Sequence, residues 1–188
     1  MNKFATSTIL RHPGAKLAGL YFATHATRPD VRAAYLIDPV DSPVNPDDRC
    51  IGFYPAANAS TFPNLAHALS AAKPPLAIAA ANITSKCNCN TSNFQELWPV
   101  LPDESWLAVL AEAGHLQVAD DSLEFCSQES IVARWILRAV FTDPSKVPLV
   151  GRYLKDWACT KGKLGTGEAI DLVTRPMIAW LDKQVKVG

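Results

Sequence analysis

Long apolar runs, an excess of charge of either sign and internal repeats are all missing from this sequence of 188 residues. No apolar run reaches the roughly 18 residues that a membrane-spanning helix needs, so we expect no transmembrane segment. Lysine and arginine together number 18, as do aspartate and glutamate, and the formal net charge is zero. This balance argues against a nucleic-acid-binding protein, which would carry a basic stripe. Residues 1–10 hold one lysine and a broken apolar stretch, which is not the pattern of a secretory signal.

Cysteine is sparse and odd in number. The five cysteines are Cys50, Cys87, Cys89, Cys126 and Cys159, so at least one of them is free or pairs between chains. Cys87 and Cys89 are too close together to form half of a zinc site, and the chain has no Cys-x-x-Cys to complete one. We therefore expect no metal site and free thiols, with a Cys126–Cys159 disulfide as the alternative.

What the sequence does contain is an alternation of helical and strand patterns. Apolar residues make up 48% of the chain, which is enough to fill the core of one domain. The predicted strands, each a continuous apolar run bounded by turn residues, lie at 31–37, 76–83 and 105–113. The predicted helices lie at about 14–25, 65–72, 131–140, 147–157 and 166–184, with a helical turn near 93–98.

This order of elements favours an α/β fold, a three-layer sandwich with a short, mostly parallel sheet and C-terminal helices. The first helix is predicted because Leu17, Leu20, Tyr21 and Thr24 recur at helical spacing after Pro13. Residues 4–10, just before it, have only a poor strand pattern.

Two residues with catalytic chemistry follow predicted strands. Asp38 comes directly after the strand at 31–37, and His115 follows the strand at 105–113. In a parallel sheet the strand ends meet at one edge, where ligands and catalytic groups collect. An aspartate that precedes a histidine is the acid–base order of α/β-hydrolases, in which the carboxylate orients the imidazole. Each residue also has a structural interpretation: Asp38 before Pro39 as a turn initiator, and His115 as an ordinary loop histidine.

Two segments carry a family resemblance. Residues 36–41, Leu-Ile-Asp-Pro-Val-Asp, resemble the Asp-Pro-Val-Asp-Gly segment of chlorophyllases. Residues 114–121, Gly-His-Leu-Gln-Val-Ala-Asp-Asp, resemble their Gly-His-(Leu/Met)-Asp-Met-Leu-Asp-Asp segment. The resemblance covers roughly residues 14–125. It implies that the chain, residues 1–188, is the C-terminal portion of a truncated α/β-hydrolase domain, with residues 1–13 outside the homologous part.

The resemblance also implies a site and a reaction. Asp38 would be the triad acid and His115 the triad base, with Asp41 the second aspartate of the motif. The implied reaction is hydrolysis of a small-molecule ester, chlorophyll, to chlorophyllide and phytol. It would run through a seryl acyl-enzyme and need no cofactor. The implied location is the chloroplast or the cytoplasm of a photosynthetic cell.

The nucleophile is the main departure from the family pattern. Chlorophyllases carry Gly-His-Ser-Arg-Gly-Gly before the corresponding helix, and His12 stands here at the position of the serine. No Gly-x-Ser-x-Gly occurs anywhere in the chain. Leu10 would crowd the tight nucleophile turn, and Pro13 lacks the backbone N–H that would donate to an oxyanion. Two smaller departures are Ser42 for the motif's glycine and Gln117 for its aspartate.

Three hypotheses for function remain open. The first is a chlorophyllase-like carboxylic-ester hydrolase by ancestry, with little or no activity as written because the nucleophile is absent. The second is a non-catalytic relic that binds a porphyrin or a partner. The third is a lipase or esterase for another substrate. The oligomeric state is left undetermined by the sequence.

The other polar and aromatic candidates have simpler interpretations. His25 and His67 lie in or near helices, as solvated or core histidines. Lys16 could contact a ligand carboxylate, but a solvated helix face is the preferred interpretation. Three C-terminal tryptophans could line a site for a flat macrocycle or pack the core; they are Trp135, Trp157 and Trp180.

Overall fold

The computed structural model describes residues 7–11, 13–28, 31, 33–41, 63–85, 88–118 and 162–186. Its centre is a parallel sheet of four strands, in which each strand pairs with the next one along the chain. The strands are β1 (Ser7–Arg11), β2 (Ala33–Ile37), β3 (Ala77–Ile83) and β4 (Trp106–Gly114). The predicted α/β class with a parallel sheet is therefore confirmed, with one strand more than the three predicted.

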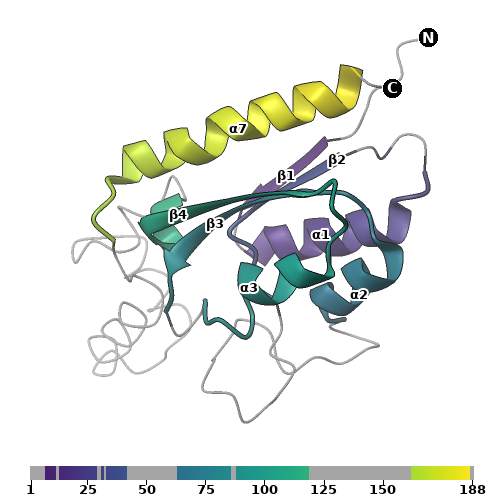
Figure 1. Cartoon of the computed structure of the whole chain (residues 1–188), viewed down its shortest axis with the longest axis horizontal. Coiled ribbons are helices and arrows are strands. Elements are labelled where there is room, and N and C mark those ends of the chain that lie inside the picture. The colour runs from purple at the N-terminus through teal and green to yellow at the C-terminus, as the bar shows by residue number, and fades with distance from the viewer. Residues whose placement is uncertain are drawn as a thin grey trace, which may run out of the picture.

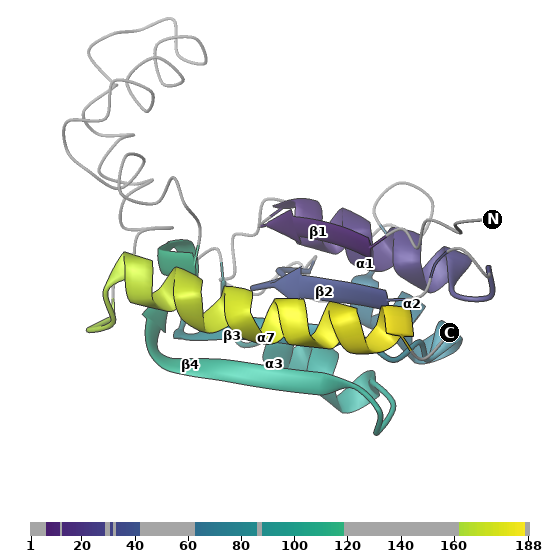
Figure 2. The same ribbon diagram turned by 90° about the horizontal axis from the view of Figure 1, so that it is seen from above.

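Helices cover both faces of this sheet and make three layers (Figure 1). On one face lie α1 (Pro13–His25), α2 (Leu65–Ala72) and α3 (Phe94–Leu97), the last continued by the 3₁₀ turn η1 (Trp98–Val100). These segments connect successive strands, and every crossover advances by one strand in the same direction. On the other face α7 (Thr166–Lys186) runs across β2 and β3 (Figure 2). A second 3₁₀ turn, η2 (His115–Val118), follows β4.

The two inner strands are buried on both faces, as their sequences predict. All five residues of β2 and the first five of β3 are buried, which a continuous apolar run between two helical layers requires. Alternate side chains enter different cores, because successive residues of a strand point to opposite faces. Leu36 and Ile78 pack under α1 and α2, whereas Tyr35 and Ala79 pack under α7.

Most element boundaries agree with the sequence predictions. The three predicted strands and the helices at 14–25 and 65–72 are found within two residues of their expected ends. The strand β1 pairs with β2 in the register Leu10 to Leu36, although its own residues form only a poor strand pattern. The predicted helices at 131–140 and 147–157 lie outside the described residues. None of the helices that the structure describes is both long and apolar enough to cross a membrane.

A buried hydrogen bond and an apolar stripe attach α7 to the sheet. The Tyr35 hydroxyl donates to the Val173 carbonyl at 2.9 Å, inside the layer between α7 and β2. Burial raises the pKa of this tyrosine above its ordinary value. Trp180 is buried in the same layer, so the core interpretation holds for this tryptophan. The helix continues through Pro176, which has no N–H to donate to the carbonyl of Leu172, a half-exposed residue.

Candidate active site

Asp38 and His115 meet at the carboxyl edge of the sheet. Asp38 follows the last residue of β2, and His115 follows the last residue of β4. Their side chains are both buried, and Oδ2 of Asp38 contacts Nδ1 of His115. The predicted proximity of the two residues is therefore confirmed, although they are 77 positions apart in the sequence. Their catalytic role stays a prediction.

The backbone of Asp38 explains how its carboxylate reaches across β3. Its φ of 44° is left-handed, a conformation that aspartate tolerates better than most residues. The Asp38 N–H still donates to the Ala79 carbonyl at 2.7 Å, which extends the pairing of β2 with β3. Oδ1 accepts a hydrogen bond from the Ala81 N–H at 3.0 Å. The chain bends at Asp38, and this bend brings the carboxylate to His115.

A third side chain completes this arrangement, and the sequence reasoning did not identify it. Asn88 is fully buried in the loop between β3 and α3, and its Nδ2 donates to Oδ2 of Asp38 at 3.2 Å. The loop also holds Asn90 and Asn93, so no spacing or motif marks Asn88 among them. Cys89, the next residue, takes part in a disulfide whose partner lies outside the described residues. The expectation of a free thiol is wrong for Cys89.

Asp41 has a structural position instead of a place beside His115. Its Oδ1 accepts from the Leu65 N–H at 2.9 Å, and its Oδ2 accepts from the Ala66 N–H at 3.0 Å, so it caps the N-terminus of α2. Nζ of Lys16, on α1, pairs with Oδ1 of Asp41 at 2.9 Å, and both side chains are buried. The prediction of a solvated Lys16 is therefore wrong. This lysine joins two helices through the capping carboxylate.

Gln117, at the position where the chlorophyllase segment has an aspartate, fixes the chain that leads into α7. Its Oε1 accepts from the N–H groups of Gly114 and Gly162, and its Nε2 donates to the Leu164 carbonyl. The Leu164 N–H in turn donates to the Glu112 carbonyl at 2.9 Å. An aspartate side chain is one carbon shorter and has no N–H, so it could not make the same set of bonds. These three contacts therefore explain a glutamine at this position.

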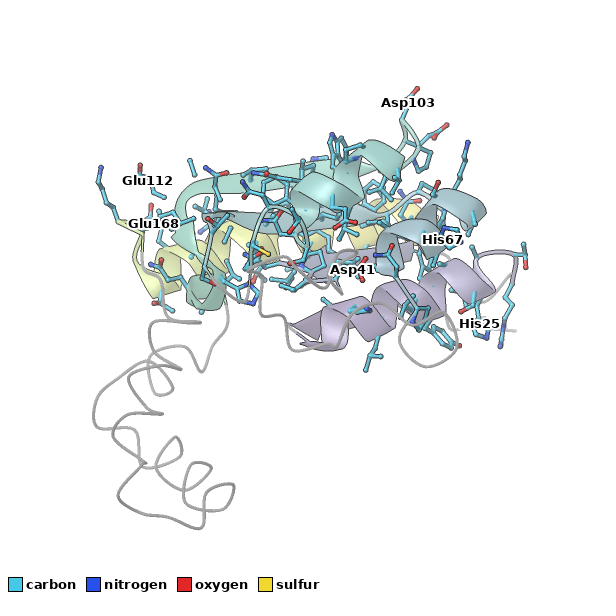
Figure 3. All side chains as sticks on the ribbon, turned by 90° about the horizontal axis from the view of Figure 1, so that it is seen from below. His25, Asp41, His67, Asp103, Glu112 and Glu168 are labelled. Carbon is cyan, nitrogen blue, oxygen red and sulfur yellow. The ribbon has the colours of Figure 1, made fainter. Side chains whose placement is uncertain are left out.

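The remaining candidates lie elsewhere or outside the described residues. Figure 3 shows His25 and His67 toward the end of the molecule opposite Glu112 and Glu168, which lie near the carboxyl ends of the strands. His25 stacks on Tyr21 with ring centroids 4.2 Å apart. Within the part of the chain that the structure describes, no three acidic, histidine or cysteine side chains are grouped to hold a metal ion. His12, at the predicted nucleophile position, lies outside that part.

Comparisons with known proteins add no relative. No family model matches the chain, no curated protein matches it, and no solved structure matches it. The chlorophyllase resemblance accordingly stays a prediction based on the two motif segments. The geometry by itself supplies a buried carboxylate–imidazole pair. Such a pair can hold a histidine in one tautomer for proton transfer.

Proposed function

We propose that this chain is, by ancestry, a chlorophyllase-like carboxylic-ester hydrolase, with Asp38 as the triad acid and His115 as the triad base. The contact between Asp38 Oδ2 and His115 Nδ1 is the observation that supports this proposal most directly. A buried carboxylate in this position orients the histidine that accepts a proton from a nucleophile and returns it to the leaving group. Chlorophyll as the substrate comes from the resemblance alone.

The layout of β1 and α1 also fits a hydrolase site, although β1 lies outside the part of the chain that the family resemblance covers. The strand β1 ends at Arg11 and α1 begins at Pro13, so a single residue, His12, separates strand from helix along the chain. A strand followed by a tight turn and a helix is the context of the hydrolase nucleophile. Arg11 is level with Ile37 in the parallel pairing. The position after Arg11 and the acid Asp38 therefore follow paired residues of neighbouring strands.

The roles of the two imidazole nitrogens follow from the contact. Because Nδ1 of His115 faces the carboxylate, Nδ1 carries the proton in the neutral ring and Nε2 is the basic nitrogen. Nε2 would take the proton of a hydroxyl nucleophile in the acylation step and donate it to the leaving alcohol. A water molecule would then attack the acyl-enzyme, again giving its proton to Nε2, and the carboxylic acid product would be released.

The junction between β1 and α1 argues that the polypeptide has little or no esterase activity. Histidine at position 12 replaces the serine that would form the acyl-enzyme. Pro13 is the first residue of α1, and a proline there offers no N–H to stabilise the oxyanion. These features also favour the second candidate, a non-catalytic relic that binds a porphyrin or a partner. Quenching of tryptophan fluorescence by chlorophyllide would detect such binding.

A fluorophosphonate probe tests the assignment. The wild-type chain is expected to remain unlabelled, because it lacks the serine. A variant with Leu10→Gly, His12→Ser and Pro13→Ala restores the small residue, the nucleophile and the backbone donor of the family motif, and it is expected to be labelled at the serine introduced by His12→Ser. Adding His115→Ala to this variant should lower the labelling rate by about a hundredfold or more, the range typical of a general base.

Three outcomes would contradict the proposal. A folded triple variant that stays unlabelled would remove the support for a hydrolase site. Labelling of the wild-type chain would disprove the predicted inactivity. A folded triple variant that reacts equally well with and without His115 would remove the histidine from its proposed role. Mass spectrometry of the labelled peptide identifies the residue wherever labelling occurs.

A further inference from the structure

We propose that Asn88 is a positioning residue for the Asp38–His115 pair, because its side-chain N–H holds the carboxylate in the orientation that faces the imidazole. The proposal concerns the geometry of the pair. Its meaning for catalysis rests on the proposed function. Neither the family segments nor the spacing of catalytic residues along the chain points to this asparagine.

The hydrogen bonds of Asp38 define this role. Its carboxylate meets three donors from three different segments: Ala81 of β3, His115 of η2 and Asn88 of the loop before α3. The Ala81 N–H fixes Oδ1, while Asn88 and His115 share Oδ2. With both oxygens held, the carboxylate cannot rotate about its Cβ–Cγ bond. The donors also compensate a buried charge that would otherwise be costly to remove from water.

The loop holds Asn88 in place for this contact. The Asn88 and Ser85 backbones bond each other reciprocally, at 3.1 and 3.3 Å. Further along the loop, the Ser92 carbonyl accepts from the Asp41 N–H at 2.6 Å. The loop after β3 is therefore closed on itself at Asn88 and tied, four residues further on, to the segment that carries Asp38.

The amide of Asn88 has one favourable orientation. Its Oδ1 is buried without a hydrogen-bond partner among the described residues, so only Asp38 determines which way the amide faces. A reversed amide would place Oδ1 against Oδ2 of Asp38, where two acceptors repel. The observed orientation, with Nδ2 toward the carboxylate, is the one that holds Asp38 in place.

A matched pair of variants tests the proposal by NMR. Asn88→Asp replaces the donor by an acceptor beside Asp38. Asn93→Asp makes the same change at a fully buried position of the same loop, where Oδ1 caps α3 by accepting from Gln95 N–H at 2.9 Å and Nδ2 has no partner among the described residues. The readout is the ring ¹⁵N and Nδ1-proton spectrum of His115, which is separable because the chain has four histidines.

The wild type and Asn93→Asp are expected to show a protected Nδ1 proton and one tautomer. Asn88→Asp is expected to lose the protected proton and show mixed tautomers. Asn88→Leu has a side chain of nearly the same size but without an N–H, and it is expected to have the same effect. It replaces Asn88→Asp as the test variant if Asn88→Asp does not fold. The proposal is overturned if a folded Asn88 variant keeps the wild-type spectrum, or if Asn93→Asp changes the spectrum equally.

This readout is independent of esterase chemistry. One outcome would refute the proposed function and keep the positioning role. In it, the His115 Nδ1 proton is protected in the wild type but not in Asn88→Leu, and the variant that carries His12→Ser stays unlabelled by the probe. Labelling that depends on His115, combined with an unchanged spectrum in the Asn88 variants, would refute the positioning role alone.

Discussion

Individual buried polar side chains connect the layers of this protein. Asp41 and Lys16 join the segment after β2 to α1 and α2, and Tyr35 joins β2 to α7. Each of these groups loses its contact with water on folding and is stable inside only because it has a partner. A change at one of them should therefore alter the stability of a whole layer.

Tyr35 gives this protein a specific dependence on alkaline pH. Burial raises the pKa of Tyr35 in the folded state above its ordinary value of about 10. The folded state thus favours the neutral phenol. The stability that this preference contributes is fully present below about pH 10 and is lost as the pH rises toward the folded-state pKa. Unfolding in urea should show a falling free energy of unfolding above about pH 10.

The Tyr35→Phe variant isolates this contribution. At neutral pH it should be less stable by about 0.5–1.5 kcal/mol, because the Val173 carbonyl loses its donor. Above about pH 10 its stability should fall less steeply than that of the wild type. Equal pH dependence in the two proteins would show that Tyr35 does not titrate with folding.

The sequence located Asp38 and His115 but not Asn88, whose side chain donates to the Asp38 carboxylate. Asp38 and His115 could be predicted because each follows a continuous apolar run, and the ends of parallel strands share one edge. Asn88 could not be predicted, since its contact depends on the path of a polar loop. The solvation of Lys16 was wrongly predicted because its buried partner, Asp41, lies 25 positions away and no local pattern links the two.

At the scale of elements, α1 shows where a periodic pattern fails. Leu17 and Tyr21 recur at helical spacing and are 59% and 42% exposed, whereas the small residues Ala15 and Ala18 are buried against the sheet. Gly19 explains this choice of face. A Cβ there would come within 2.8 Å of the Leu65 side chain, so the helix approaches its neighbours through its small residues. Spacing identified the helix, but close packing determined its orientation.

The strand β1 illustrates the opposite case. Its polar residues Ser7 and Thr8 give a weak local signal, yet it pairs with β2 along its whole length. The strand is specified by its neighbour, whose backbone groups need partners, more than by its own propensity. The inner strands β2 and β3 were predictable because their apolar runs carry the signal themselves.

The entry to α7 is a second close approach that can be tested. A Cβ on Gly162 would lie 1.8 Å from the Glu112 carbonyl oxygen, so Gly162→Ala must displace the backbone that Gln117 holds. We expect it to lower the free energy of unfolding by about 1–3 kcal/mol or more. Gly167→Ala is the matched control, because nothing lies within 4 Å of its Cβ and the position is in α7. That variant should be neutral or more stable by up to about 1 kcal/mol. Urea unfolding measures the free energy of unfolding of both variants. Equal values for Gly162→Ala and Gly167→Ala would contradict a tight contact at Gly162.

At the scale of the whole molecule, the described sheet is open at both edges. Each of β1 and β4 pairs on one side only within the described residues, and Figure 2 shows them at opposite margins of the sheet. Unpaired strand edges and exposed apolar side chains are the usual routes to association. The formal net charge of zero adds no repulsion between copies. We therefore expect this chain to associate as its concentration rises.

Leu17 tests this expectation without disturbing the core. It is 59% exposed on α1, the helix that packs under β1 and β2. Leu17→Lys should slow aggregation on heating, because it removes an apolar contact and adds charge. Its melting midpoint should stay close to that of the wild type, because an exposed substitution changes stability by about 0.5 kcal/mol or less and lysine is nearly as good a helix former as leucine. Leu20→Lys is the control variant on the same helix.

Leu20 packs against the core, so the Leu20→Lys variant should be less stable than the wild type by about 0.5–3 kcal/mol. Light scattering follows the aggregation, and calorimetry measures the melting midpoint. A wild-type chain that stays monomeric at high concentration, and that aggregates on heating no faster than Leu17→Lys, would show that this exposed surface does not drive association.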